Sequence, residues 1–535
     1  MNTRSKPLPL LALCVLALFA FRTATCHAAA AAEFAVTQNE VPKMPAAGVY
    51  EFKNNTVDME LSEYAGYAGV IAANHGLAAN EDSIFFKKYG FKLNIALSEE
   101  ESRPALTAGK LAALATTTDV LPVFGKQFKI SVPLLISFSR GGDGVVVRSS
   151  IKRINELKGK VLVAAQFTES DFFIRYLVGE AGLHVAMLPK IDATPNPDAV
   201  NLIFTADAFG AGDLFLNDIK SGANKLAGCV TWDPKTTEVA QQSAGQAHIL
   251  ITNRNLLIVA DILTLNKGFA MQNPAIVEGL VSGWMEGNRM VQQDPATQLP
   301  TIAKAFKWDM DKAKSEMAKV HLSNLPENLA FFSGAMDAAG SYSGIYQSAL
   351  DAYGSEMIKN PVDSDYFLDL KALKAIEKSG VYKDQKVSIA PIRSNAGTPV
   401  EKDPLLNKDI RFYFNPNSAE LDLKKTENLK YLDDIKKLLA VSPGSTVLIR
   451  GHVDNTYIDE FRKTGGEEFV KKMALAAKEL SKNRAKEIKR LVVERCNADP
   501  ERLDIFGCGW DEPVSKSPAE SQLNRRVEIQ WFMVE

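Results

Sequence analysis

The stretch Arg450-Gly-His-Val-Asp454-Asn-Thr456 lies in the last quarter of the chain and is one of four motifs that decide how this quarter folds. The others are Ile410-Arg-Phe-Tyr-Phe414 with Ser418-Ala-Glu-Leu421, Leu480-Ser-Lys-Asn-Arg484-Ala485, and Asn524-Arg-Arg-Val-Glu-Ile-Gln-Trp531. Aromatic and branched residues in the first and last of these predict strands, as they do in Thr446-Val-Leu-Ile-Arg450.

Two helices are predicted between these strands. Apolar residues recur at helical spacing from Leu429 to Leu439, and Ala474 to Val493 is rich in residues that favour helices. A further strand is predicted at Leu503-Asp-Ile-Phe506. Strands that alternate with helices predict one sheet with helices packed on it.

The four motifs, in this order, resemble the OmpA-like domain, a β/α module that binds peptidoglycan, and the resemblance covers residues 405–535. It implies that Asp454 and Arg484 grip diaminopimelate, a residue of the peptidoglycan stem peptide. A carboxylate suits the ammonium group of that ligand, and a planar guanidinium suits its carboxylate. The neighbouring candidates for peptidoglycan binding are Asn455, Thr456, Arg525 and Arg526.

The sequence departs from this family in two places. Tyr457 stands where the family has a glycine, and the segment from Tyr457 to Ala477 is longer than usual. Ala477 stands where an asparagine usually precedes the Leu-Ser pair. The alternative interpretation is that Asp454 caps a loop and Arg484 is a solvated charge on a helix.

The N-terminus predicts export. Arg4 and Lys6 precede an apolar run from Leu10 to Phe21, and small residues follow, which is typical of a signal peptide over residues 1–30. The run is too short to span a bilayer as a helix. We therefore expect a soluble protein of the periplasm and cell envelope, and Cys26 leaves open a lipoprotein.

Composition narrows the class of protein further. A length of 535 residues suggests about three domain-sized units. A net charge of -2 gives no support for a nucleic-acid partner. Outside the signal peptide the cysteines are Cys229, Cys496 and Cys508, and a disulfide between the last two is as plausible as two separate thiols. With six scattered histidines and no cysteine-histidine cluster, neither a metal site nor a cofactor is expected.

Residues 56–385 alternate short strand-like and helix-like runs, which predicts an α/β fold. The predicted strands are Val57–Leu61, Phe91–Leu97, Leu111–Thr116, Gly144–Val147, Lys160–Ala164, Val200–Phe204, Gly228–Thr231 and Ile249–Thr252. The predicted helices include Phe172–Ala181, Gly212–Lys220 and Pro274–Met290. Ligands on such sheets usually bind outside the carboxyl ends of the strands.

Four segments of this region resemble a periplasmic solute-binding protein of the two-lobed, type II-like class that serves sulfonate, nitrate and thiamine-precursor importers. They are Tyr64-Ala-Gly-Tyr67 with Ala72-Ala-Asn-His-Gly76, Leu157-Lys-Gly-Lys160-Val161 with the helix near Thr168, Gly212 to Pro234, and Ala260-Asp261-Ile-Leu with Asn273-Pro274. The resemblance implies a cleft between two lobes that captures a small molecule.

Eight residues at predicted strand ends are candidates for ligand binding. They are Tyr64, Tyr67, Asp119, Thr168, Glu169, Ser170, Trp232 and Asp233. Hydroxyl and backbone N–H groups at a helix start suit an anion, but Glu169 stands where the family has a small residue. Together with Asp119 and Asp233 it favours a cationic or polyhydroxylated ligand, on which aromatic residues would stack. The alternative is that the tyrosines are packing residues and Glu169 is an exposed charge.

Residues 386–404 mix Pro, Gly, Ser, Asn and charges and are predicted to be a linker between the two halves. No nucleophile elbow, phosphate loop or metalloprotease motif is present in the sequence, so we predict a protein that is not an enzyme. The first hypothesis is a solute-binding protein anchored to peptidoglycan, which serves an inner-membrane ABC-type importer or a sensor. The alternative is a structural cell-envelope anchor whose N-terminal lobes bind a protein partner. Under either hypothesis we expect an association with the outer membrane.

Overall fold

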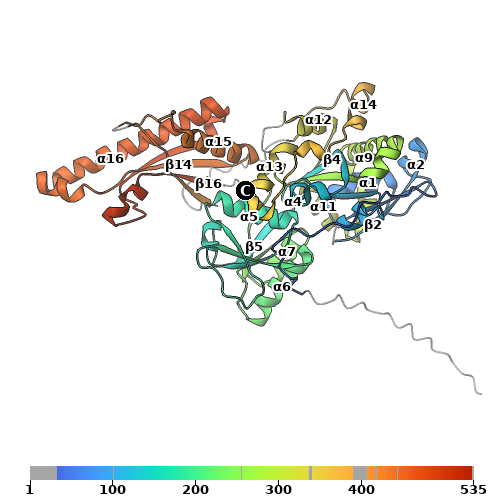
Figure 1. Cartoon of the computed structure of the whole chain (residues 1–535), viewed down its shortest axis with the longest axis horizontal. Coiled ribbons are helices and arrows are strands. Elements are labelled where there is room, and N and C mark those ends of the chain that lie inside the picture. Colours follow the sequence, from blue (N-terminus) through green and yellow to red (C-terminus); the bar gives the residue numbers. More distant parts are fainter. Residues whose placement is uncertain are drawn as a thin grey trace, which may run out of the picture.

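The computed structural model describes residues 33–99, 102–254, 256–335, 340–389, 406–415, 418–442 and 444–532. The described residues contain three sheets, each with its own helices (Figure 1). The predicted signal peptide and residues 390–404 of the predicted linker lie outside the described residues. Among the described helices, none is long and apolar enough to cross a membrane.

The first sheet forms lobe 1, and its strands lie in the order β12-β4-β11-β3-β1-β2. The strands are β1 (Thr56–Leu61), β2 (Lys92–Leu97), β3 (Ala113–Thr117), β4 (Ile130–Ser139), β11 (Ala260–Asn266) and β12 (Val320–Leu322). The helices of this part are α1 (Ala68–Asn74), α2 (Ile84–Tyr89), α3 (Arg103–Thr107), α4 (Val120–Phe124), α8 (Lys267–Gln272), α9 (Pro274–Gln293), α10 (Pro295–Phe306), α11 (Met310–Met317), α12 (Leu325–Ser333) and α14 (Lys371–Ser379). β1, β2 and β3 are parallel, whereas β11 runs against both β3 and β4.

The second sheet forms lobe 2, and its strands lie in the order β10-β5-β9-β6-β8-β7. The strands are β5 (Asp143–Arg148), β6 (Val161–Ala165), β7 (Val185–Met187), β8 (Val200–Thr205), β9 (Gly228–Trp232) and β10 (Ala247–Thr252), and the helices are α5 (Glu169–Glu180), α6 (Ala208–Ser221) and α7 (Lys235–Gln242). A further helix, α13 (Tyr342–Met357), packs on both α4 and α5. As in lobe 1, the sheet contains neighbouring parallel strands, here β9, β6, β8 and β7, and one strand that runs the other way, β5. The predicted two-lobed α/β fold is confirmed by this arrangement.

The chain crosses between the lobes twice, from β4 to β5 and from β10 to β11. Asn253 ties the crossings together, because its side-chain oxygen accepts from the N–H groups of Gly141 (2.8 Å) and Asp143 (3.2 Å). Its amide nitrogen donates to the carboxylate of Asp143 at 2.8 Å. Asn253 is fully buried, so these bonds are shielded from water and fix the geometry of the hinge.

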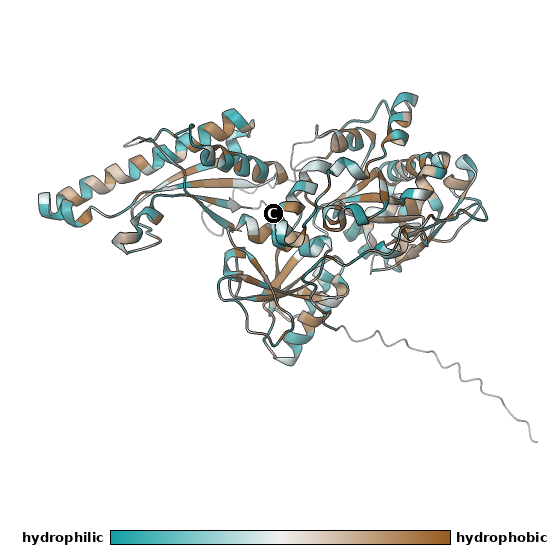
Figure 2. Ribbon diagram, viewed as in Figure 1, coloured by the Kyte–Doolittle hydropathy of each residue, from teal (hydrophilic) through white to brown (hydrophobic). Residues whose placement is uncertain are grey.

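The third sheet has the order β13-β16-β14-β15 and carries two long helices on it. Its elements are β13 (Leu406–Ile410), α15 (Thr426–Val441), β14 (Thr446–His452), α16 (Ile458–Cys496), β15 (Leu503–Gly509) and β16 (Val527–Phe532). Buried apolar residues of the strands form the centre of each of the three parts. In Figure 2 the helices alternate hydrophobic and hydrophilic residues along the ribbon. The predicted sheet with helices packed on it is therefore present.

The C-terminal sheet contacts lobe 2 through its edge strand β13. The side chain of Asn155 both donates to the carbonyl of Asn407 (3.1 Å) and accepts from its N–H (3.0 Å), as a strand would. Lys408 lies 3.7 Å from the carboxylate of Glu180 at the end of α5. These contacts cover part of an edge that would otherwise expose unpaired backbone groups.

Several elements differ from the sequence prediction. The strand predicted at Ile410–Phe414 lies instead at Leu406–Ile410, as β13. β4 was not among the predicted strands of the α/β pattern, because its apolar run contains Pro133 and shows no alternation. The pairing of β4 with β11 has a register shift beside this proline, which has no N–H to donate. α16 begins at Ile458, before the predicted start at Ala474, and is bent at Gly465 and Gly466, where the backbone leaves helical geometry.

The possible disulfide between Cys496 and Cys508 is not formed in the structure. Cys496 ends α16, whereas Cys508 lies in β15 beside Gly509, whose N–H donates to Ser481 in the middle of that helix. Fifteen residues separate Ser481 from Cys496, which corresponds to about 22 Å of helix. The two cysteines therefore lie at different ends of the helix–strand pair.

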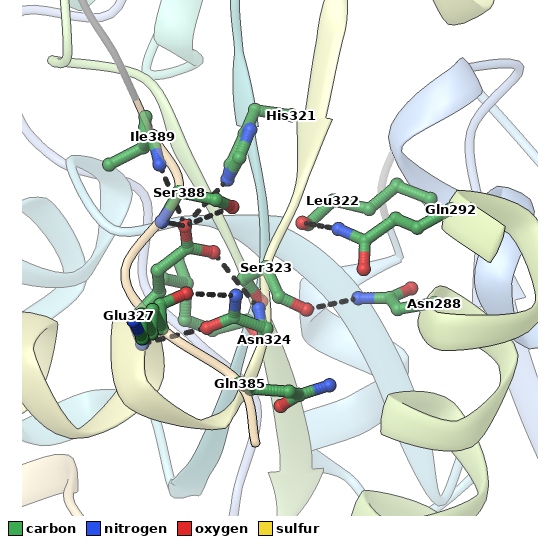
Figure 3. A network of polar contacts seen from close by, with 12 residues as sticks. Asn288, Gln292, His321, Leu322, Ser323, Asn324, Glu327, Gln385, Ser388 and Ile389 are labelled. Atoms are coloured by element: carbon green, nitrogen blue, oxygen red, sulfur yellow. Dashed lines mark hydrogen bonds and ion pairs between the residues drawn. The ribbon is translucent and has the colours of Figure 1, made fainter. Parts of the chain in front are cut away.

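A buried carboxylate holds the last described residues of the N-terminal half against lobe 1 (Figure 3). Oε1 of Glu327 accepts from the N–H groups of Ser388 (2.8 Å) and Ile389 (2.9 Å) and lies 2.9 Å from Nε2 of His321. Its other oxygen accepts from the N–H of Asn324 at the start of α12. Burial opposes ionisation, but these hydrogen bonds hold the pKa of Glu327 below its usual range.

Replacing Glu327 with glutamine should lower the free energy of unfolding by about 2 kcal/mol. The side-chain NH2 group of glutamine is a donor, and it would face N–H groups that are donors themselves. A lowered pKa means that the stability contributed by Glu327 is present at neutral pH and is lost as the pH falls below the ordinary value of 4.5. Calorimetry at pH 7 and pH 4 measures both effects. Glu356→Gln, at an exposed position, is the control, and equal midpoints for the two variants at pH 7 would contradict the prediction.

Candidate functional site

The cleft between the lobes has an empty volume of about 330 Å³. Its lining consists of Ser62, Tyr64, Tyr67, Thr117, Ser139, Asp143, Glu169, Trp232, Val259 and Asp261. These residues come from both lobes and from the two crossings between them. The cleft thus lies where the lobes meet and where their relative movement would change its width.

The topology explains why these side chains converge. Ser62 follows the carboxyl end of β1, Thr117 ends β3 and Trp232 ends β9, so each lies at the edge of a sheet where ligands of α/β proteins bind. Asp143 is the first residue of β5 and Asp261 the second of β11. Both strands run the opposite way, so their starts reach the same edge.

Two carboxylates of the cleft are buried and held by neutral donors. Asp261 accepts from the hydroxyl of Tyr67 at 3.1 Å and from that of Ser137 at 2.9 Å. Asp143 accepts from Asn253, as described above. Both aspartates are only 3% exposed, so their charges are nearly without solvent. The hydrogen bonds named here come from neutral groups and orient the two carboxylates.

Ionisation in the cleft is shifted accordingly. The pKa of Asp143 is raised to about 6. Burial is the main cause and the charge of Asp233 adds to it, while hydrogen bonds from Ser139 and Asn253 act in the opposite direction. Burial, with the charges of Asp261 and Asp143, raises the pKa of Tyr64 well above its usual range. The tyrosine is therefore neutral at physiological pH, and a negative charge in the cleft is costly.

Aromatic rings form part of the wall. Tyr64 and Tyr67 meet edge to face, with ring centroids 5.3 Å apart. Trp232 packs on Phe209 with centroids 5.6 Å apart. The indole N–H of Trp232 has no hydrogen-bond partner among the described residues, although the residue is only 7% exposed.

The eight residues that the sequence indicates for ligand binding divide into two groups. Tyr64, Tyr67, Glu169 and Trp232 line the cleft, whereas Asp119, Thr168, Ser170 and Asp233 are not in its lining. The hydroxyl of Thr168 donates to the carbonyl of Ala165, and Asp233 pairs with Lys319 at 2.8 Å. Asp119 and Ser170 are fully buried. The prediction that these four face the cleft is therefore corrected.

The lining also contains residues that the candidate set lacked. They are Ser62, Thr117, Ser139, Asp143, Val259 and Asp261. The sequence holds a signal for two of them, because an aspartate opens each strand that follows a crossing. Gly141-Gly142-Asp143 precedes one strand and Ala260-Asp261 begins the other.

A second, larger pocket lies in the C-terminal part, with an empty volume of about 1980 Å³. Asp454 lies on the loop after β14, where its carboxylate accepts from the N–H of Thr456 (3.1 Å) and pairs with Arg525 at 2.5 Å. Arg484 lies on α16 over the ring of Phe414, with 4.8 Å from the guanidinium carbon to the ring centroid. Asp454, Arg484 and Arg525 all line this pocket.

Close packing of α16 on the sheet brings the two motifs together. A Cβ atom at Gly451 would collide with the backbone oxygen of Ser481, so the glycine beside the histidine is required for the helix to approach. The hydroxyl of Ser481 accepts from the N–H of Gly509 at 2.9 Å and fixes the helix on β15. The Gly-His and Leu-Ser pairs therefore position Asp454 and Arg484.

The electrostatics of this pocket favour both signs of charge. Burial opposes ionisation of Asp454, but hydrogen bonds from Thr456 and Arg525 hold the pKa of its carboxyl below the usual range. Burial, and then the charge of Arg525, lowers the pKa of Arg484. Of the remaining candidates, Asn455 and Thr456 are not in the lining, and Arg526 is in the lining but pairs with Asp409 at 3.2 Å.

The segment from Tyr457 to Ala477 adds aromatic side chains to the wall of the pocket. Its helix begins after Tyr457, and Phe461 stacks on Trp510 with ring centroids 6.2 Å apart and an angle of 27° between the rings. Phe469 meets Phe461 edge to face at 5.8 Å. Tyr457, Phe461 and Trp510 line the pocket, so this segment contributes aromatic side chains to the site.

Comparison with known proteins agrees with this division of the chain. Residues 413–526 match the OmpA family, so the predicted OmpA domain is confirmed. Outer membrane protein Omp38 from two strains of Acinetobacter baumannii is 30% identical over 146 residues, which are 26% of this chain and 36% of that protein. The match thus spans about a third of the length of these relatives.

Solved structures of binding proteins resemble the N-terminal half. The periplasmic aliphatic sulphonate binding protein SsuA from Escherichia coli is 14% identical, covers 60% of this chain and 99% of its own, and has a TM-score of 0.43. The periplasmic nitrate-binding protein NrtA from Synechocystis PCC 6803 is 13% identical, covers 63% and 91%, and has a TM-score of 0.44.

Proposed function

We propose that the chain is an exported solute-binding protein that residues 405–535 hold non-covalently on peptidoglycan. The two lobes capture a small molecule and present it to an inner-membrane ABC-type permease or to a sensor. The wall-binding part rests chiefly on one observation: Asp454, Arg484 and Arg525 line one pocket of an OmpA domain.

The chemistry of that pocket suits the free end of diaminopimelate, which carries an ammonium group and a carboxylate. Asp454 accepts from the ammonium, and Arg484 binds the carboxylate with its planar fork. Arg525 pairs with Asp454 and is exposed, so it is placed to turn to the carboxylate when the ammonium arrives. The guanidinium of Arg526 already pairs with Asp409, so we assign Arg526 a structural role and no contact with the ligand.

The variants Asp454→Ala and Arg484→Lys should each reduce the fraction of protein pulled down by purified peptidoglycan by about tenfold, the loss expected for a charged hydrogen bond. Lysine keeps the charge of Arg484 but loses the bidentate geometry. Arg490→Lys, at an exposed position on the same helix, is the matched control. Retention of both variants at the wild-type level, with unchanged melting midpoints, would mean that the wall is bound by another surface.

The solute-binding part rests on the cleft between the lobes, whose polar lining converges from both sheets. A ligand that bridges the lobes stabilises the closed form and raises the unfolding midpoint by mass action. A thermal-shift screen of small metabolites therefore tests it. Silence across a broad library would favour the structural anchor, whose lobes bind a protein.

A further inference from the structure

The pocket of the C-terminal part combines charged side chains with an aromatic wall. Asp454 and Arg484 line it together with Tyr457, Phe461 and Trp510. Tyr457 is 55% exposed, although its ring is large and mostly apolar. Exposed apolar surface beside polar groups is typical of a place where another molecule binds. The charged residues account for the ammonium and the carboxylate of a ligand, whereas the aromatic residues call for an apolar face.

Trp510, at the base of the aromatic wall, is fixed by contacts on both sides of it in the chain. The N–H of Gly509 donates to the hydroxyl of Ser481 at 2.9 Å, and the carboxylate of Asp511 pairs with Lys478 at 2.9 Å. Ser481 and Lys478 both belong to α16. The loop after β15 is therefore tied to the helix on either side of the tryptophan.

The ring of Tyr457 is supported by other rings. The N–H of Phe461 donates to the carbonyl of Tyr457 at 3.0 Å, so the two residues lie one helical turn apart, and their ring centroids are 6.3 Å apart. Phe461 stacks in turn on Trp510. A Cβ atom at Gly465 would lie 2.6 Å from that of Phe469, so the glycine in the bend allows Phe469 to pack against Phe461. Tyr457 is thus held in place while its own ring stays exposed.

The distance from Asp454 to Tyr457 suits a ligand longer than one amino acid. In peptidoglycan, two residues of the stem peptide separate diaminopimelate from the sugar N-acetylmuramate. These two residues span about 7 Å when extended, and the side chain of diaminopimelate adds to this length. Tyr457 follows Asp454 by three residues, so their Cα atoms lie at most about 11 Å apart. A strand whose ammonium group reaches Asp454 therefore brings its sugar within reach of Tyr457.

We propose that Tyr457 forms a sugar subsite, in which its ring packs against the N-acetylmuramate that carries the bound stem peptide. This inference rests on the peptidoglycan binding proposed above. One face of a pyranose ring presents C–H groups, whose hydrogens are slightly positive and suit the negative face of an aromatic ring. The phenol hydroxyl can both donate to and accept from the sugar hydroxyls. The domain then recognises the glycan as well as the peptide of the wall.

Isothermal titration of the full mature chain at pH 7.5 tests the subsite with two probes. They are the tripeptide L-alanyl-D-glutamyl-diaminopimelate and the same tripeptide with N-acetylmuramate attached. The wild type should bind the muramyl tripeptide about tenfold more tightly, a gain that requires the burial of about 50 Å² of apolar surface. Arg484→Lys should weaken the binding of both probes.

Variants of Tyr457 identify the ring that contacts the sugar. Tyr457→Ala should reduce the affinity for the muramyl tripeptide to that for the tripeptide, whose own affinity should not change. Tyr457→Phe keeps the ring and should retain most of the tenfold gain. Leu475→Ala is the matched control, because it removes a 71% exposed apolar side chain from the same helix outside the pocket lining, and it should bind both probes as the wild type does.

The outcomes separate the two proposals. Equal affinity of the wild type for both probes would overturn the sugar subsite and leave wall binding standing. Equal weakening of both probes by Tyr457→Ala, in a variant whose circular dichroism matches the wild type, would place the ring against the stem peptide and also overturn the inference. Silence with both probes would overturn wall binding through this pocket and the subsite with it.

Discussion

Asp143→Asn should raise the midpoint of thermal unfolding of the ligand-free protein at pH 7.5 by about 5 °C. The carboxylate is 3% exposed, and its pKa is raised from 3.8 to about 6, mainly by burial. A raised carboxyl pKa means that the ionised form destabilises the folded state. The shift corresponds to roughly 3 kcal/mol at pH values above 6.

The sign of this effect makes it testable by pH. The contribution of Asp143 to stability is complete below pH 3.8 and is lost as the pH rises through 6. The groups that face the carboxylate are Ser139, Asn253 and Asp233, and Tyr64 titrates far above this range. Glu169 and Asp261 share the cleft with Asp143.

Asparagine keeps the oxygen that accepts from Asn253, so the hinge contact survives in the variant. Differential scanning calorimetry at pH 7.5 and pH 4.5 measures the effect, and the advantage of the variant should shrink at the lower pH. Asp311→Asn is the control, because its side chain is 99% exposed. An advantage of equal size at both pH values would show that the gain has another cause.

Glu528→Gln should destabilise the C-terminal domain by about 3 kcal/mol at pH 7. Burial opposes ionisation, but hydrogen bonds from His452 and Gln530 and the charge of Arg450 hold the pKa of Glu528 at about 2. Oε2 of Glu528 lies 3.2 Å from Arg450 and 3.9 Å from Arg526. Removal of this charge leaves two partly buried guanidinium groups without their shared partner.

The pH window follows from the direction of the shift. A lowered carboxyl pKa means that this contribution is present above pH 4.5 and is lost as the pH falls toward 2. Hydrogen exchange of peptides that cover β14 and β16 measures the local stability. Glu468→Gln, at an exposed position on α16, is the control. Equal exchange in both variants at pH 7 would contradict a stabilising role for Glu528.

The C-terminal domain was more predictable than the cleft because its functional residues stand in contiguous motifs. Gly451 and Ser481 belong to the same motifs as Asp454 and Arg484, and they bring the helix onto the sheet. A short pattern therefore encodes both the packing and the site. The bend at Gly466 was not predictable in this way, because it lies outside the four motifs.

The cleft depends instead on residues far apart in the chain. Asp143 and Asp261 reach one edge only because their strands run against the parallel ones, and strand direction is a property of the whole sheet. The strand-end aromatics Tyr64 and Trp232 could be found, since they follow predicted parallel strands. Asp119 and Asp233 also follow or end such strands, but local packing and an ion pair take them out of the lining.

The contact of Asn155 with Asn407 decides which part of the protein moves with respect to the cell wall. The same face is joined by Lys408 with Glu180 and by the N–H of Leu257, in the crossing between the lobes, which donates to Val441 at 2.8 Å. If the C-terminal domain is bound to peptidoglycan, lobe 2 is held in place with it, and lobe 1 is the part that moves when the cleft opens or closes. The surface that changes position when solute arrives would then be that of lobe 1, which a permease or sensor could read.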